Sequence, residues 1–183
     1  KADSKTGEAL EGAVFGLFAK EDIVNADGEI VLAKDTQIER AATGKDGKAI
    51  FTSDLPLGQY YVKELEAPKG YATTDKVVDI DASYQGDDME VIEFTADFVN
   101  DTTKVEFSKT DITGDNEIAG AKLTILDSTG KVIEMWTSEA GKSHLVEKLP
   151  VGNYILREET APYGYKIAQD VEFTVEDTGE VQK

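Results

Sequence analysis

One motif occurs twice in this chain, and the repeat constrains the fold more than any other feature. Residues 58–71 and 152–165 share the frame G-x-Y-x-[VL]-x-E-x-x-A-P-x-G-Y, and Leu-Pro precedes both copies as part of a Leu-Pro-x-Gly turn. Upstream, Lys1 precedes Gly12 and Lys109 precedes Gly120 by the same eleven residues. A repeat of this length specifies a structural unit each time it occurs. The chain is therefore predicted to form two domains, near 1–100 and 101–183, joined by the short polar segment 101–103.

The secondary structure reads as strands. Short runs of alternating apolar and polar residues recur roughly every 8–15 residues, with Gly, Asp and Asn between them. No window carries a helical stripe. The predicted fold class is all-β: two tandem, Ig-like, antiparallel β-sandwiches. The first copy has the longer Lys-to-Glu interval, so it is expected to carry an insertion near residues 21–40.

Charge and composition narrow the function classes. The formal net charge is −18, and both halves are acidic, which argues against a nucleic-acid partner. Cysteine is absent and His144 is the single histidine, so disulfides, thiol chemistry and a Cys–His triad are excluded, and no metal or cofactor is expected. His144 is expected at the surface in a polar turn, and Trp136 is expected to pack on a sheet. No run reaches the roughly 18 apolar residues of a membrane span, and no signal peptide opens the sequence. The sequence is expected to come from the interior of a longer protein.

Strand parity places charged and polar residues on core faces. Lys109 shares a face with Val105 and Phe107, because side chains two residues apart point the same way. By the same rule Glu64 lies on the same strand face as Tyr60 and Val62, and Glu158 lies on the same face as Tyr154 and Leu156. Asn100 shares its face with Ile92, Phe94, Ala96 and Phe98. Parity cannot place Lys1, which is assigned by its repeat spacing alone.

Burying these groups is costly unless they are paired or neutralised, since burial lowers the pKa of a lysine and raises the pKa of a glutamate. A neutral amine is a nucleophile, and a protonated carboxyl can polarise a carboxamide. Together they could form a Lys–Asn isopeptide bond with release of ammonia. The alternative is a buried Lys–Glu ion pair capped by Asn, with no reaction, and parity alone favours that alternative.

The motifs resemble those of a known family. The frame Lys-x-Asp…Thr-Gly…Gly-Ala-x-Phe-x-Leu from Lys1 to Leu17, and the repeated Tyr-x-[VL]-x-Glu-x-x-Ala-Pro-x-Gly-Tyr, are similar to Cna B-type (SpaA-like, prealbumin-like) domains of Gram-positive pilins and adhesins. The second half also resembles the domain from which split tag-and-catcher ligation systems were made. The resemblance implies a cross-linking lysine at Lys1, a catalytic acid at Glu64 and an acceptor at Asn100, and it favours the isopeptide interpretation for the first domain.

The second domain departs from this pattern. The resemblance implies the lysine and acid roles for Lys109 and Glu158. The 36-residue interval from Glu64 to Asn100, counted from Glu158, passes beyond Lys183. Asp170 and Asp177 are poor substitutes, because Asp170 shares a face with polar residues and Asp177 lies in a turn. The second domain is therefore expected to lack its last strand, and the partner of Lys109 to lie beyond Lys183 or to be absent.

The resemblance implies a structural stalk module of a Gram-positive surface adhesin or pilin, extracellular and anchored to the cell wall through another part of the protein. Its expected partners are neighbouring domains and other pilin subunits. The alternative function is a ligand-binding adhesin module that recognises a host matrix protein. A turnover enzyme is disfavoured, because self-ligation consumes the reacting residues. No nucleic acid or membrane partner is expected within these residues.

Overall fold

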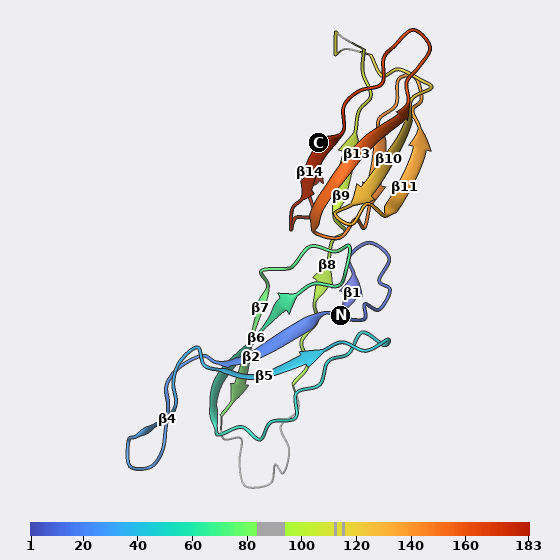
Figure 1. Cartoon of the computed structure of the whole chain (residues 1–183). Coiled ribbons are helices and arrows are strands. Elements are labelled where there is room, and N and C mark those ends of the chain that lie inside the picture. Colours follow the sequence, from blue (N-terminus) through green and yellow to red (C-terminus); the bar gives the residue numbers. More distant parts are fainter. Residues whose placement is uncertain (84–93, 112, 115) are drawn as a thin grey trace. The chain divides into compact units, whose positions relative to one another are not determined.

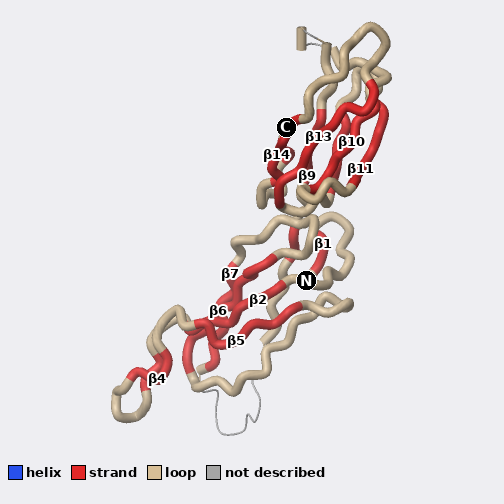
Figure 2. The backbone as a smooth tube through the Cα atoms, viewed as in Figure 1, coloured by secondary structure: helices blue, strands red, loops and turns tan. Residues whose placement is uncertain are grey.

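The computed structural model describes residues 1–83, 94–111, 113–114 and 116–183, and it is all-β in these ranges (Figures 1 and 2). Two compact units divide the chain: unit 1 contains Lys1–Pro68 and Thr73–Asp101, and unit 2 contains Lys69–Ala72 and Thr102–Lys183. The described ranges contain no apolar helix of membrane-spanning length.

Unit 1 has one large sheet and two small ones. The large sheet has the order β5-β2-β6-β7 and is antiparallel throughout. A short parallel pair joins the first strand to the last, with Ala2 opposite Val99 and Asp3 opposite Asn100. The strands are β1 (Ala2–Asp3), β2 (Val14–Ala19), β3 (Ile23–Val24), β4 (Ile30–Leu32), β5 (Gln37–Ala42), β6 (Gly58–Glu66), β7 (Val77–Ala82) and β8 (Val99–Asn100).

Unit 2 repeats this plan. Its large antiparallel sheet has the order β11-β10-β13-β14, and its second sheet has the order β12-β9-β15. In that second sheet β15 runs parallel to β9, with Val181 opposite Lys104. The strands are β9 (Lys104–Phe107), β10 (Lys122–Asp127), β11 (Val132–Thr137), β12 (His144–Glu147), β13 (Gly152–Thr160), β14 (Val171–Val175) and β15 (Val181–Gln182).

Apolar side chains on alternate strand positions fill the core of each unit. In unit 2 the cluster joins Val105 of β9 and Val146 of β12 to residues of the large sheet, so the two sheets face each other as in a sandwich. The core of unit 1 contains Ala13, Phe15, Leu17, Ile23, Tyr60, Val62, Ala82 and Phe98. The all-β tandem fold is confirmed, although the pairing is not purely antiparallel, because in each unit the first and last strands run in the same direction.

The repeated motif has a local structural reason. In both copies its first tyrosine donates a hydrogen bond to the proline carbonyl of the preceding turn: Tyr60 Oη lies 2.5 Å from Pro56 O, and Tyr154 Oη lies 2.8 Å from Pro150 O. This bond fixes the Leu-Pro-x-Gly turn against the strand that follows it. The motif therefore starts the long strands β6 and β13.

Two differences between the units bear on the predictions. Residues 20–36 separate β2 from β5 in unit 1, where four residues separate β10 from β11 in unit 2, and the extra residues form the β3–β4 hairpin. His144 was expected in a turn but begins β12, where it lies opposite Phe107, because the strand pairing starts earlier than the polar sequence suggests. Ile92, expected to share a core face with Asn100, lies outside the described residues.

Candidate functional site

Glu64 is the centre of the candidate site in unit 1. It lies on β6 on the same face as the buried residues Tyr60 and Val62, as parity predicts, and its side chain is fully buried. One carboxylate oxygen, Oε1, lies 3.0 Å from Lys1 Nζ. The other, Oε2, accepts hydrogen bonds from Asn100 Nδ2 at 2.7 Å and from the Thr74 backbone N–H at 2.9 Å. The carboxyl thus brings together the two residues that the sequence assigns to the cross-link.

The parallel pairing of β1 with β8 positions the amine and the amide. Because Ala2 is opposite Val99, Lys1 and Asn100 extend from neighbouring strands into the same part of the core. The Lys1 side chain is 1% exposed, and its Nζ lies 5.7 Å from the centroid of the Phe15 ring and 5.9 Å from that of Phe98. Burial lowers the pKa of the Lys1 amine, and the neighbouring Glu64 opposes the shift without cancelling it. The neutral, nucleophilic form of the amine is therefore easier to reach here than in an exposed lysine.

Unit 2 builds the same lysine–glutamate pair. Lys109 Nζ lies 3.0 Å from Glu158 Oε1, and the Glu158 side chain is 2% exposed. The Ala168 backbone N–H donates to Glu158 Oε2 at 2.5 Å, as the Thr74 N–H does in unit 1. Thr74 and Ala168 each follow their glutamate by ten residues, so the two donors occupy equivalent positions of the repeat.

The two sites differ in what covers the lysine. The Lys109 side chain is 20% exposed, compared with 1% for Lys1. Asp170 does not approach Glu158: its carboxylate pairs with Arg157 Nη2 at 2.8 Å at the surface, and this pairing lowers its pKa. Asp177 is exposed in the bend before β15. In the described part of unit 2, therefore, no residue takes the position that Asn100 has in unit 1.

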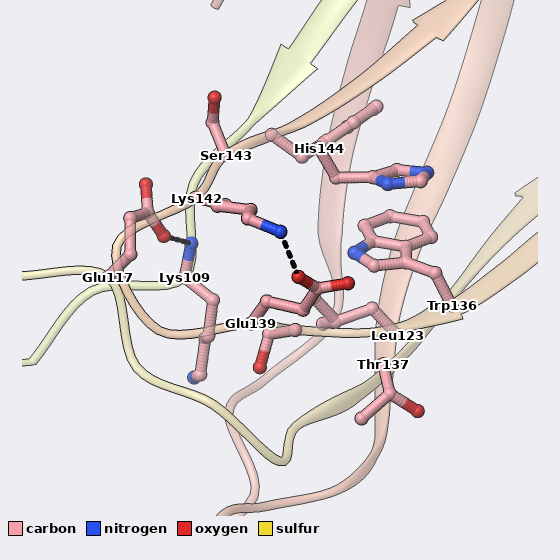
Figure 3. Close-up of a pocket in the computed structure, with 11 residues that line it drawn as sticks. Lys109, Glu117, Leu123, Trp136, Thr137, Glu139, Lys142, Ser143 and His144 are labelled. Atoms are coloured by element: carbon pink, nitrogen blue, oxygen red, sulfur yellow. Dashed lines mark hydrogen bonds and ion pairs between the residues drawn. The ribbon is translucent and has the colours of Figure 1, made fainter.

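A small pocket of about 70 Å³ opens beside Lys109 (Figure 3). The Lys109 backbone N–H donates to Glu117 Oε2 at 2.7 Å, and Lys142 pairs with Glu139 at 2.6 Å on the rim. The far wall is Trp136, whose ring stacks on His144 with centroids 4.3 Å apart. Trp136 packs on the sheet as expected. His144 is not simply a surface residue, because its ring is one third exposed and also contacts Glu134 at 2.7 Å. No local residue pattern indicates this stack, because Trp136 lies on β11 and His144 on β12, which belong to different sheets.

Comparison with known proteins agrees with the observed fold. A family model described as SpaA, a prealbumin-like fold domain, matches residues 1–95 and 103–183. The trypsin-resistant surface T6 protein of Streptococcus pyogenes serotype M6 is 36% identical over 84 residues, which cover 46% of this chain and 13% of that protein.

Solved structures also resemble the chain. The Bacillus anthracis TIE protein superposes with a TM-score of 0.51 and 26% identity, over 97% of this chain and 30% of the other. GBS52, a minor pilin of Streptococcus agalactiae, matches at a TM-score of 0.40 and 19% identity, over 98% of this chain and 82% of the pilin. The chain thus spans less than a third of the T6 and TIE proteins. The two family-model matches cover nearly all of it, and the chain therefore belongs to the SpaA prealbumin-like fold domain family, of which it contains two copies.

Proposed function

We propose that the chain is a structural module of a Gram-positive surface pilin or adhesin, and that unit 1 closes an isopeptide bond between Lys1 and Asn100. The observation that carries the proposal is the buried Glu64 carboxyl, which holds the Lys1 amine on one oxygen and the Asn100 amide on the other. Such an arrangement supplies the high effective concentration that a slow amide exchange needs.

The reaction balances with the chain's own groups. The neutral Lys1 amine attacks Cγ of Asn100. Glu64 contacts the amide nitrogen of Asn100, so the carboxamide first rotates to turn its oxygen to the carboxyl, and a protonated Glu64 then polarises that oxygen. A C–N bond forms to Lys1 Nζ, and the bond from Cγ to the original amide nitrogen breaks. Glu64 carries the proton from the attacking amine to the leaving nitrogen, so ammonia departs and the carboxyl is regenerated. The residues react once, so the chain is not a turnover enzyme.

The cross-link would tie the first strand of unit 1 to its last. Such a tie closes a loop of about 100 residues, worth roughly 4.7 kcal/mol by the loop-entropy relation used for disulfides. Force applied along the chain could then not separate β1 from β8 beyond the bond. This suits a protein that is exposed to mechanical force at a cell surface, and the Streptococcus pyogenes relative is named a surface protein. The proposed location is extracellular, attached to the cell wall by another part of the protein, with neighbouring domains and pilin subunits as partners.

In unit 2 we propose that Lys109 and Glu158 form a site that still needs its acceptor. The pair has the geometry of unit 1, with a more exposed lysine. β15 pairs only Val181 and Gln182 with β9, so the β9 edge beyond Val105 is open to a longer parallel strand. Such a strand could bring an Asn or Asp to Lys109, as β8 brings Asn100 to Lys1.

The intact mass of the recombinant chain tests whether unit 1 forms the Lys1–Asn100 bond. The mass is expected to fall short of the sequence value by one ammonia, and tandem mass spectrometry should join Lys1 to Asn100 through Nζ and not through the α-amine. Glu64→Ala should restore the full mass, because the carboxamide is no longer activated. Glu66→Ala is the matched control: Glu66 ends the same strand with its side chain 64% exposed, and its loss should leave the cross-link intact. Full mass in the wild-type chain would refute the proposal.

One observation favours the alternative of a ligand-binding module. The β3–β4 hairpin of unit 1, which unit 2 lacks, exposes Val24, Ile30 and Val31 by 53%, 58% and 54%. Exposed apolar side chains on an added hairpin can form a contact surface. Binding of the chain to host matrix proteins, lost when residues 22–33 are replaced by a short turn, would support that function.

A further inference from the structure

The Ala-Pro-x-Gly-Tyr loop of the repeat has a different environment in each copy. In the first copy Gly70, Tyr71 and Ala72 are buried, and residues 69–72 belong to unit 2. In the second copy Tyr163 is fully exposed and Tyr165 is 50% exposed. The same motif is therefore packed in one copy and presented to solvent in the other.

Within unit 2, three kinds of contact hold the buried loop. Gly70 O accepts a hydrogen bond from the Thr103 backbone N–H at 3.1 Å and lies 3.3 Å from Thr103 Oγ1. Tyr71 forms a β-bridge with Thr102, and Lys148 Nζ lies 5.1 Å from the centroid of its ring. Thr103 Oγ1 also donates to Leu149 O at 2.6 Å, which fixes the receptor for the loop. The receptor thus consists of the Thr-Thr segment before β9 and the turn before β13.

The fit around Gly70 is close. A Cβ added at this residue would lie 2.5 Å from Lys148 O and 2.9 Å from Lys148 Cα. Gly164, its counterpart, has a matching φ of +87°, but a Cβ added there meets no atom within 4 Å. Both glycines adopt a positive φ, +84° at Gly70 and +87° at Gly164, which glycine accepts without strain. In the second copy the turn is closed by a hydrogen bond from Tyr165 N to Pro162 O at 3.0 Å. Only the first has a neighbour that requires the absence of a side chain.

We propose that the exposed loop 163–166 is a docking surface for a further module of this family in the same polypeptide, received as residues 69–72 are received in unit 2. The module that fits has a Thr-Thr segment before its first strand and a Lys-Leu-Pro turn before its long strand. A second copy of this chain does not fit as well, because its own receptor already holds residues 69–72. The proposal requires no cross-link in either unit, so it stands independently of the proposed function.

The test extends the full chain at Lys183 with a second copy of residues 91–183, which supplies a last strand and a further receptor. Hydrogen exchange is measured on the peptide 161–168 in the parent and in the extended chain. We expect exchange of this peptide to slow by about tenfold or more on extension, toward the rate of peptide 67–74. Unchanged exchange, with the amides of the appended long strand protected as in the parent, would overturn the proposal.

Gly164→Asn is the diagnostic variant. Asn tolerates a positive φ better than other residues with a side chain, so the unextended variant should melt close to the parent. In the extended chain the added side chain at this position would clash with the receptor and prevent docking. Exchange at 161–168 should then return to the fast rate, and continued protection would refute the docking mode. Lys109→Ala in the extended chain should keep the protection, which separates failure of docking from failure of cross-linking.

Discussion

Replacing Asn100 by Ala tests the energetic role of the proposed cross-link in unit 1. The variant retains the Lys1–Glu64 pair but lacks the acceptor, so the bond between the first and last strands cannot form. Loss of a closed loop of about 100 residues costs roughly 4.7 kcal/mol. Loss of the hydrogen bond to Glu64 adds about 1 kcal/mol. A domain of this size loses about 4–8 °C of Tm per kcal/mol, so the transition of unit 1 should fall by at least about 20 °C.

Scanning calorimetry of the wild-type and variant chains measures this shift, with the intact mass recorded for both. Glu66→Gln is the control, since it removes an exposed partner of Arg40 on the same strand and should change Tm little. Under denaturing electrophoresis the cross-linked wild type should also migrate faster than Asn100→Ala. If the wild-type mass shows the cross-link but Asn100→Ala melts within a few degrees of the wild type, the loop-closure reasoning is wrong.

Three further predictions concern the two lysine–glutamate sites and the repeated loop. Extending the chain with residues 91–101 should produce an additional ammonia loss that Lys109→Ala abolishes; a cross-link from Lys109 to Asp170 or Asp177 in the unextended chain would show the proposed strand order to be wrong. In Asn100→Ala the Lys1 amine stays free, and burial lowers its pKa in the folded chain. At pH values between this lowered pKa and the ordinary lysine pKa of 10.5, the unfolded chain binds more protons than the folded chain, so the free energy of unfolding should rise with pH. Denaturant melts of the variant at several pH values measure this rise. Gly70→Ala should destabilise the chain by roughly 2 kcal/mol more than Gly164→Ala in urea melts, because only Gly70 faces a close carbonyl.

The length of that extension comes from the strand register. Ala82 and Val175 hold the same place in the two large sheets, opposite Gly58 and Gly152. Asn100 follows Ala82 by 18 residues, whereas only eight residues of this sequence follow Val175. Ten added residues therefore complete the same 18-residue interval, and the tenth residue of the added segment 91–101 is the asparagine. The longer loop lets the added strand replace Val181 and Gln182 beside β9. This count differs by one residue from the 36-residue interval measured from the glutamates.

The repeated all-β plan and much of the candidate site follow from local residue patterns. Parity is a local rule, so it correctly placed Glu64 and Glu158 on buried faces, each beside a core tyrosine, without knowledge of distant contacts. The repeat spacing added Lys1, which parity could not place. The residues that support them, Thr74 and Ala168, were overlooked because a backbone N–H carries no residue-type signal.

The differences between the two copies arise from contacts between segments that are far apart in the chain. Whether Lys1 or Lys109 is covered depends on which strand lies beside it, and the parallel pairings of β1 with β8 and β9 with β15 join residues far apart in the chain. The same holds for the stack of Trp136 on His144 and for the burial of Tyr71 where Tyr165 is exposed. These contacts depend on loop lengths and register between distant segments, and local alternation of residues contains no information about either.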